Sequence, residues 1–200
     1  MNDIGVFARR LRFAVRLWLT DAPRIVVGAA STRLPGWIST NRATLDLTRR
    51  EDWQRWFGRK PVRSLLAEHV WEHLSPGDAA LAVGLCFDHL APGGRLRLAV
   101  PDGLHPDPGY VDSVRPGGTG AGADDHQVLY DYRSLGCLLG DAGFIVEPLE
   151  YFDEAGVFHR SPWDPADGMV VRSARFDPRN VGGKLAYTSV VMDAHKPEVS

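Results

Sequence analysis

A short polar motif near the middle of the chain carries the side chains best suited to chemistry. Residues 68–73 read Glu-His-Val-Trp-Glu-His and directly follow the mostly apolar run 62–67, which has the length of a buried strand. If a helical turn begins there, His69, Glu72 and His73 are spaced i, i+3 and i+4 and share one face. Two imidazoles and a carboxylate on one face can bind a metal ion. Either imidazole can also act as a general base, because histidine titrates close to physiological pH.

A second candidate, His126, lies where a long loop gives way to a helix, beside Asp124 and Asp125. These carboxylates could fix the tautomer of His126 or raise its pKa. For the whole cluster we favour a structural role, then proton transfer by His69, His73 or His126, and metal binding last. No metal site is favoured, and a divalent metal would have to use His69, Glu72, His73 and His126.

Length, charge and cysteine content limit what surrounds these residues. The chain has 200 residues, which fits one domain spanning residues 1–200, and its net charge of −2 argues against nucleic-acid or membrane partners. Its two cysteines, Cys86 and Cys137, are too few for a disulfide scaffold and suit a reducing compartment. No apolar run is long enough for a membrane span, so we expect a cytoplasmic protein. A homo-oligomer remains open.

Strand-like and helix-like segments alternate along the chain, which predicts an α/β fold with a mostly parallel seven-stranded sheet. The last strand is expected to run antiparallel. In such sheets, ligands bind beyond the carboxyl ends of the strands, here after Val27, Thr40, Ala67 and Val100. The predicted strands are 24–28, 37–40, 44–48, 62–67, 95–100, 144–152 and 186–194, and the predicted helices are 2–19, 50–57, 76–90 and 131–142.

Three segments outside this alternation also have predicted roles. The N-terminal segment 1–21 holds an amphipathic helix, whose apolar stripe we expect to pack on the core rather than on a membrane. Residues 103–128 show no period and are typical of an active-site loop or lid. Residues 153–176 form an insertion that would cover the substrate pocket or make a dimer contact. The apolar stripe of the N-terminal helix consists of Phe7, Leu11, Ala14, Val15 and Trp18.

Three motifs, taken in order, resemble a known family. They are Val-Gly-Ala-Ala at 27–30 with Leu-Pro-Gly-Trp-Ile at 34–38, Ala-Glu-His-Val-Trp-Glu-His-Leu at 67–74, and Leu-Ala-Pro-Gly-Gly-Arg-Leu-Arg-Leu-Ala-Val-Pro at 90–101. Over residues 22–196 the chain resembles class I S-adenosylmethionine-dependent methyltransferases, specifically an uncharacterised group with a short N-terminal half. The resemblance implies a Rossmann-like fold, S-adenosylmethionine as cofactor and methyl transfer to a small-molecule acceptor.

The resemblance also implies which residues bind the cofactor. The turn at 28–31, with Gly28, Ala29 and Ala30, would hold the methionine part of the cofactor, and Glu68 is also assigned to cofactor binding. Asp46 would lie near the adenine. The chain departs from the family pattern at Ala30, where a second glycine is usual, and at Asn41, where an acid usually binds the ribose. These departures motivate an alternative in which the fold is kept without methyl transfer, as a cyclase, isomerase or hydrolase using the histidines, or as a non-catalytic partner.

Overall fold

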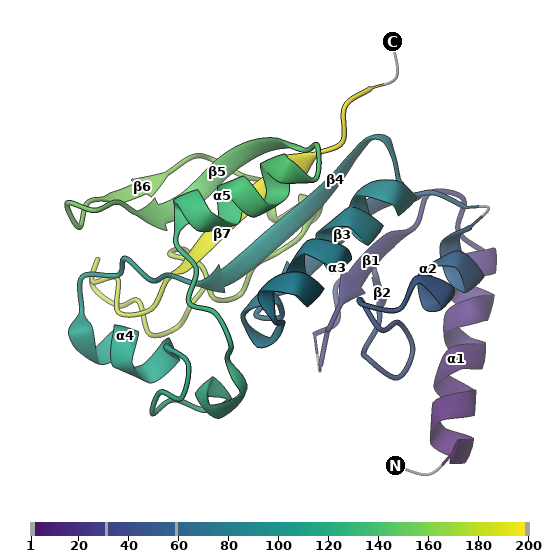
Figure 1. The fold of residues 1–200 in the computed structure, drawn as a ribbon, viewed down its shortest axis with the longest axis horizontal. Coiled ribbons are helices and arrows are strands. Elements are labelled where there is room, and N and C mark those ends of the chain that lie inside the picture. The colour runs from purple at the N-terminus through teal and green to yellow at the C-terminus, as the bar shows by residue number, and fades with distance from the viewer. Residues whose placement is uncertain (1–2, 31, 59, 199–200) are drawn as a thin grey trace.

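The computed structural model describes residues 3–30, 32–58 and 60–198, which form a seven-stranded mixed sheet with flanking helices (Figure 1). The strands are β1 (Arg24–Val27), β2 (Ile38–Ser39), β3 (Val62–Glu68), β4 (Leu90–Pro101), β5 (Ile145–Phe152), β6 (Phe158–Arg160) and β7 (Ser189–His195). They lie in the order β2-β1-β3-β4-β7-β5-β6. β1 to β4 pair in parallel, whereas β7 is antiparallel to both β4 and β5, and β6 is antiparallel to β5. The predicted α/β fold with an antiparallel last strand is confirmed.

The helices begin where the sequence provides caps. The Ser75 side chain accepts a hydrogen bond from the Asp78 backbone N–H, and Pro76 occupies the first position of α3. Asp131 and Ser134 form a reciprocal capping box at the start of α5. The helices are α1 (Asp3–Trp18), α2 (Arg50–Phe57), α3 (Pro76–His89), α4 (Pro108–Val114) and α5 (Tyr132–Asp141), with 3₁₀ turns at Trp71–His73, Ala123–Asp125 and Pro165–Asp167.

The two faces of the sheet are covered differently. Strand alternation turns Ile25 and Val27 toward α3 and α5, which pack on one face. Val26 points to the opposite face, where the irregular segment 161–188 supplies Val170 as a buried partner. Arg97 fixes this segment, because its guanidinium is fully buried, pairs with Asp193 through two 2.7 Å contacts and donates to the Gly168 carbonyl. An irregular segment therefore reaches the carboxyl edge of the sheet, where a ligand site is expected.

Two sequence predictions about the elements were wrong. Residues 44–48 form turns rather than a strand, because the Asp46 carboxylate accepts the backbone N–H and the hydroxyl of Thr48 and closes the chain locally. The seventh strand is instead β6, which forms a hairpin with β5 inside the predicted insertion. The region 103–128 is not wholly irregular either, since Asp107 caps α4 by accepting the Gly109 backbone N–H.

The apolar stripe of α1 does not pack on the core, contrary to prediction. Phe7, Leu11 and Trp18 are 69%, 55% and 78% exposed, whereas Phe13 and Leu17 are buried. The core-facing side of α1 is therefore the side that also carries arginines, and their long stems tolerate partial burial.

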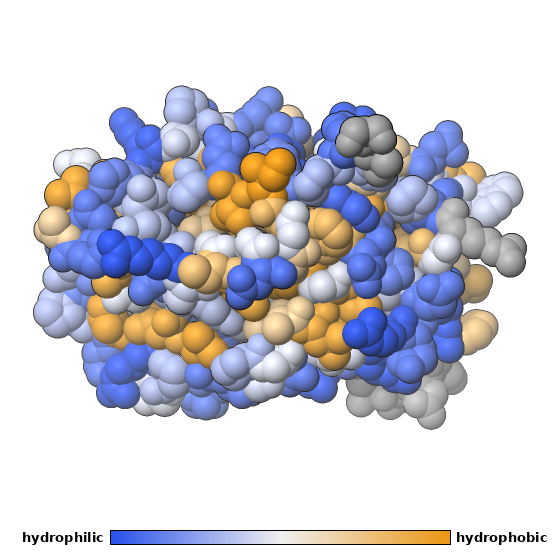
Figure 2. Space-filling model, turned by 45° about the horizontal axis from the view of Figure 1, so that its top comes forward, coloured by the Kyte–Doolittle hydropathy of each residue, from blue (hydrophilic) through white to orange (hydrophobic). Residues whose placement is uncertain are grey.

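On the face drawn in Figure 2, apolar side chains form several patches separated by hydrophilic ones. Among the described residues, no helix is both long and apolar enough to cross a membrane.

Candidate functional site

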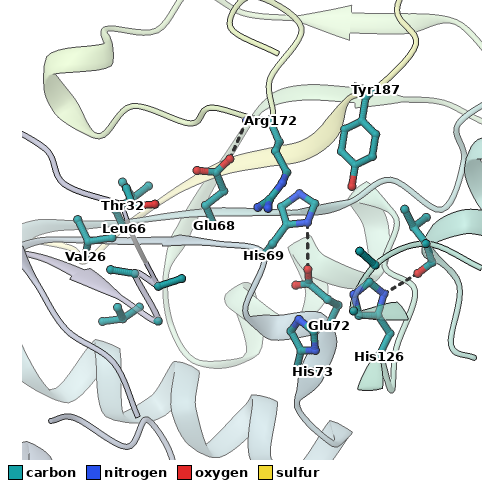
Figure 3. Close-up of a pocket in the computed structure, with 18 of the residues that line it drawn as sticks. Val26, Thr32, Leu66, Glu68, His69, Glu72, His73, His126, Arg172 and Tyr187 are labelled. Atoms are coloured by element: carbon teal, nitrogen blue, oxygen red, sulfur yellow. Dashed lines mark hydrogen bonds and ion pairs between the residues drawn. The ribbon is translucent and has the colours of Figure 1, made fainter. Parts of the chain in front are cut away.

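A cavity of about 590 Å³ opens beyond the carboxyl ends of β1 and β3 (Figure 3). This is where the strand-end rule places a ligand site. Four segments far apart in the sequence line it: the turn after β1, the motif after β3, the segment 113–126 and the segment 172–187. A second cavity of about 470 Å³ shares Gly28, His69 and His73 with the first. The polar groups that line the first cavity include Thr32, Glu68, His69, Glu72, His73, Ser113, His126, Arg172, Arg179 and Tyr187.

The turn after β1 exposes its backbone to the cavity. Gly28 has a φ of +60°, and a Cβ atom added there would lie 2.5 Å from Val70 Cγ2. Glycine is therefore favoured at this position, because a side chain would be strained at this φ and would displace Val70. Ala30 also adopts a left-handed conformation, with a φ of +43°, and Ala29 lies buried between the two. Ser31, the last residue of the predicted turn, lies outside the described residues.

The structure separates two of the three other predicted cofactor residues, Asp46 and Asn41. Asp46 lines the second cavity together with Gly28. Burial raises the pKa of Asp46, but hydrogen bonds from Thr48 and the nearby Arg42 outweigh it and lower the pKa overall. Asn41 lies elsewhere, in a cavity of about 270 Å³ between β2 and the arginines of α1, and its side chain accepts a hydrogen bond from Thr44. Asp46 is thus close to the proposed cofactor turn, and Asn41 is not among the residues that line either of the first two cavities.

Glu68 joins the motif after β3 to the irregular C-terminal segment. Its carboxylate accepts a 2.6 Å hydrogen bond from the Arg172 backbone N–H. Both residues line the main cavity. This contact places the Arg172 side chain beside the histidine cluster, as Figure 3 shows.

His69 is held in an unusual backbone conformation. Its φ is +54°, in the left-handed region, and its backbone N–H donates to the Ala99 carbonyl on β4. Its Nε2 lies 3.0 Å from the Ser189 hydroxyl, which itself donates to the Arg172 carbonyl. Since that hydroxyl proton is already used, Nε2 must be the donor to Ser189. The constrained backbone and this bond together aim Nδ1 at Glu72.

Glu72 is the most unusual group in the site. Its side chain is 1% exposed, and neither carboxylate oxygen has a hydrogen-bond donor among the residues described. His69 Nδ1 lies 3.2 Å from Glu72 Oε1, a distance suitable for an ion pair, but the contact lacks hydrogen-bond alignment. Buried polar groups are nearly always hydrogen-bonded, so an unpartnered carboxylate requires an explanation.

His73 and His126 complete the cluster from two different segments. Their rings meet edge to face, with centroids 4.7 Å apart. Asp125 was predicted to interact with His126, but it accepts a 2.9 Å hydrogen bond from His73 Nδ1 instead. His126 Nδ1 donates to the Val114 carbonyl at 2.7 Å. One ring nitrogen of each histidine and one Glu72 oxygen lie within 4.8 Å of one another.

Four further aromatic and histidine side chains do not line the main cavity. Tyr130 is a core residue, and burial raises its pKa to about 12. Tyr132 stacks on Tyr151 instead of lining the cavity. His105 is buried with both ring nitrogens hydrogen-bonded, and His159 pairs with Asp153 in the β5–β6 hairpin. These side chains have structural partners.

Sequence reasoning missed the contribution of the C-terminal segment. Arg179 stacks on Tyr187, with its guanidinium carbon 3.4 Å from the ring centroid, and pairs with Asp177. Burial raises the pKa of Tyr187, although Arg172 and Arg179 counteract this effect. Arg172 falls in the insertion 153–176, which was predicted to cover the substrate pocket or make a dimer contact, and Tyr187 falls in the predicted last strand. No local signal placed Arg179 or Tyr187 at the cavity.

A second buried carboxylate, Asp102, follows β4 at the same edge of the sheet. Its two oxygens accept the backbone N–H groups of Leu104 and Phe152, at 3.0 and 2.8 Å. Burial nevertheless raises the pKa of Asp102 to about 6. Asp102 does not line the main cavity, and its hydrogen bonds tie β4 to β5.

Comparison with known proteins identifies the architecture. No protein-family model and no curated protein matches the sequence. Among solved structures, an O-methyltransferase family protein from Burkholderia thailandensis superposes with a TM-score of 0.53 at 11% identity, over 98% of this chain. The chain has the class I methyltransferase fold. It spans 57% of the length of that protein.

Two further solved structures are more distant matches. A SAM-dependent methyltransferase from Archaeoglobus fulgidus has a TM-score of 0.46 at 14% identity, with 94% of each chain covered. The 1,6-didemethyltoxoflavin-N1-methyltransferase of Burkholderia thailandensis, solved with 1,6-didemethyltoxoflavin and S-adenosylhomocysteine, has a TM-score of 0.46 at 17% identity, over 96% of this chain and 79% of that one.

Proposed function

We propose that this protein binds S-adenosylmethionine beyond the ends of β1 and β3 and transfers its methyl group to a small-molecule acceptor. The observation that carries the proposal is the cavity at the exposed Gly28 turn, in a chain with the class I methyltransferase fold. Its volume of about 590 Å³ falls within the range of roughly 300–1,000 Å³ typical of small-molecule sites.

The residues present suit this cofactor. Exposed backbone at Gly28 allows close approach of a ligand's polar groups. Glu68 and Asp46 place negative charge in the two adjoining cavities, which suits a ligand carrying ammonium and sulfonium cations. When bound, S-adenosylmethionine supplies an electrophilic methyl group. We assign the adenine side to the cavity with Asp46 and the methyl side to the main cavity, which His126 also lines.

The acceptor side is assigned to the segments 113–126 and 172–187. We propose that the segment 103–128 covers the acceptor and excludes water, because part of it forms one wall of the cavity. His69, His73 and His126 line the same space and are the proposed proton acceptors for a hydroxyl or amine nucleophile. Arg172 and Tyr187 supply hydrogen-bond donors that orient a polar acceptor.

Calorimetric titration with S-adenosylmethionine tests the proposal. We expect saturable binding by the wild-type protein and weaker binding by Gly28→Ala. Gly140→Ala is a matched control, because a Cβ at that helical position meets no atom within 4 Å. Absence of binding by the folded wild-type protein at millimolar cofactor would overturn the proposal.

One observation supports a second candidate, a reaction that uses the histidine cluster without methyl transfer. Asn41, at the position that the resemblance assigns to the ribose, lies in a separate cavity. Turnover of a candidate substrate by the histidine cluster with no S-adenosylmethionine present, together with failure to bind the cofactor, would favour this alternative.

A further inference from the structure

We infer that Glu72, His73 and His126 form a binding site for a divalent transition-metal ion. The inference does not depend on methyl transfer, because it rests on the arrangement of these three side chains and of the groups behind them. It is tested with metal alone.

The first step is the missing partner of Glu72. The carboxylate is almost fully buried, yet neither oxygen has a hydrogen-bond donor among the described residues. A neutral His69 cannot supply one, since its Nε2 carries the proton given to Ser189, which leaves a lone pair on Nδ1 facing Glu72. A cation beside the carboxylate, whether a protonated His69 or a metal ion, would compensate the charge.

The second step is the convergence of ligand atoms on this carboxylate. One nitrogen of His73, one nitrogen of His126 and one oxygen of Glu72 lie within 4.8 Å of one another. Glu72 and His73 belong to the 3₁₀ turn after β3, and His126 follows the turn at Ala123–Asp125. The backbone carbonyl of Glu72 accepts the Gln127 N–H at 2.7 Å, which fastens the two segments together. The fold thus holds the three groups in place before any ligand binds.

The third step is the orientation of the two imidazoles. His73 donates from Nδ1 to the Asp125 carboxylate, and His126 donates from Nδ1 to the Val114 carbonyl. Each ring therefore keeps Nε2 available as a ligand atom. Metal-bound histidines characteristically donate their other ring N–H to a carboxylate or to a backbone carbonyl, which fixes the tautomer. A protonated His69 would balance the charge of Glu72. It would not account for the two neighbouring imidazoles, His73 and His126, that each donate from Nδ1 and keep Nε2 free.

The donor set indicates the class of metal. Two imidazoles and one carboxylate favour Zn²⁺, Fe²⁺, Co²⁺ or Mn²⁺ over Mg²⁺ or Ca²⁺, which prefer oxygen ligands. Three protein ligands leave at least one coordination position free, as in reactive rather than structural sites. All three ligands line the main cavity, so the free position faces it. With metal bound, His73 and His126 become ligands, and His69 remains as a proton acceptor.

The test is metal content and the visible absorption spectrum of Co²⁺-loaded protein, measured without S-adenosylmethionine. We expect about one equivalent of Co²⁺ or Zn²⁺ per chain, removable by chelator, with ligand-field bands in the Co²⁺ form. His73→Ala and His126→Ala should lose the bands, and Glu72→Gln should lose or shift them. His159→Ala is the matched control, because His159 also pairs with an aspartate, at 2.7 Å, but lies in the β5–β6 hairpin.

Two results would overturn the inference. One is a folded wild-type protein that takes up neither Co²⁺ nor Zn²⁺. The other is equal loss of metal in His159→Ala and His73→Ala. Circular dichroism of each variant separates loss of the ligand from loss of the fold. Because no cofactor is used, failure of this test leaves the cofactor titration to decide methyl transfer separately.

Discussion

Two buried carboxylates beyond the ends of neighbouring parallel strands have opposite surroundings. Asp102, after β4, is fully buried, and each of its oxygens accepts a backbone N–H. Glu72, after β3, is buried to the same extent, but its oxygens have no donor among the described residues and face three histidines instead. The fold satisfies the first carboxylate by itself, whereas the second lacks such donors and, as we infer, is satisfied by a bound cation. Burial alone therefore does not distinguish a structural acid from a ligand-binding one, but hydrogen-bond accounting does.

The largest expected effect that separates the two carboxylates is stabilisation by metal. Zinc at about a hundredfold excess over its dissociation constant should raise the free energy of unfolding of the wild-type protein by about 3 kcal/mol, because it binds only the folded state. Glu72→Gln should lose this gain, and Asp102→Asn should keep it. Urea unfolding with and without zinc measures the three gains. If zinc raised the free energy of unfolding equally in all three proteins, Glu72 would be no more a zinc ligand than Asp102.

The second expected effect is a pH dependence that belongs to Asp102. Because burial raises the pKa of this group from its ordinary value of 3.8 to about 6, the folded state holds its proton more tightly than the unfolded state. Its contribution to stability is present below about pH 4 and is lost as the pH rises through about 6, an effect of about 3 kcal/mol. The difference in unfolding free energy between wild type and Asp102→Asn should shrink between pH 4 and pH 7. A constant difference would contradict the assignment.

A third, smaller effect extends the comparison to the end of β1. Gly28→Ala should weaken S-adenosylmethionine binding roughly tenfold, because the added Cβ would force Val70 into the space between the two cavities. Val70→Ala in the same chain should restore part of the affinity by removing the clash, while the strain at positive φ remains. Calorimetry on the single and double variants checks this. If the double variant binds no better than the single one, crowding by Val70 is not the cause.

The smallest change in stability is expected for the exposed apolar stripe of α1. There, apolar side chains face solvent, whereas at Glu72 and Asp102 charged side chains are buried. Leu11→Gln should change the free energy of unfolding by no more than about 0.5 kcal/mol, since Leu11 is 55% exposed. Phe13→Ala, two residues away, should cost about 3 kcal/mol, because Phe13 is buried against Trp56 and Phe57. Chemical denaturation of both variants tests the pair. A large loss of stability in Leu11→Gln would show that the stripe is covered by other parts of the fold.

The sequence predicted the framework because its signals are local. Aliphatic runs marked β1 and β3, and the caps at Ser75 and Asp131 marked where α3 and α5 begin. The strand-end rule then located the histidine motif at the carboxyl edge without any structure. The same capping logic, applied to Asp107 and Pro108, would also have found α4.

What the sequence could not supply depends on contacts between distant segments. Periodicity showed that α1 has an apolar face but not that Phe13 and Leu17, off that face, would pack on the core. The positions of Arg172 and Tyr187 at the cavity depend on tertiary contacts such as the one between Glu68 and Arg172, which no local pattern shows. The hydrogen-bond partners of the imidazole nitrogens likewise come from residues far along the chain. Those partners distinguish the three roles predicted for the cluster, which are structural support, proton transfer and metal binding.

The most direct test of the contrast between Glu72 and Asp102 is anomalous diffraction from crystals grown with zinc, with data collected above and below the zinc absorption edge. We predict a peak that is present only above the edge and that lies about 2.0–2.2 Å from a Glu72 oxygen and from Nε2 of His73 and His126. No such peak should lie near Asp102. A fully occupied zinc site elsewhere, with Glu72 paired only to His69, would contradict the account.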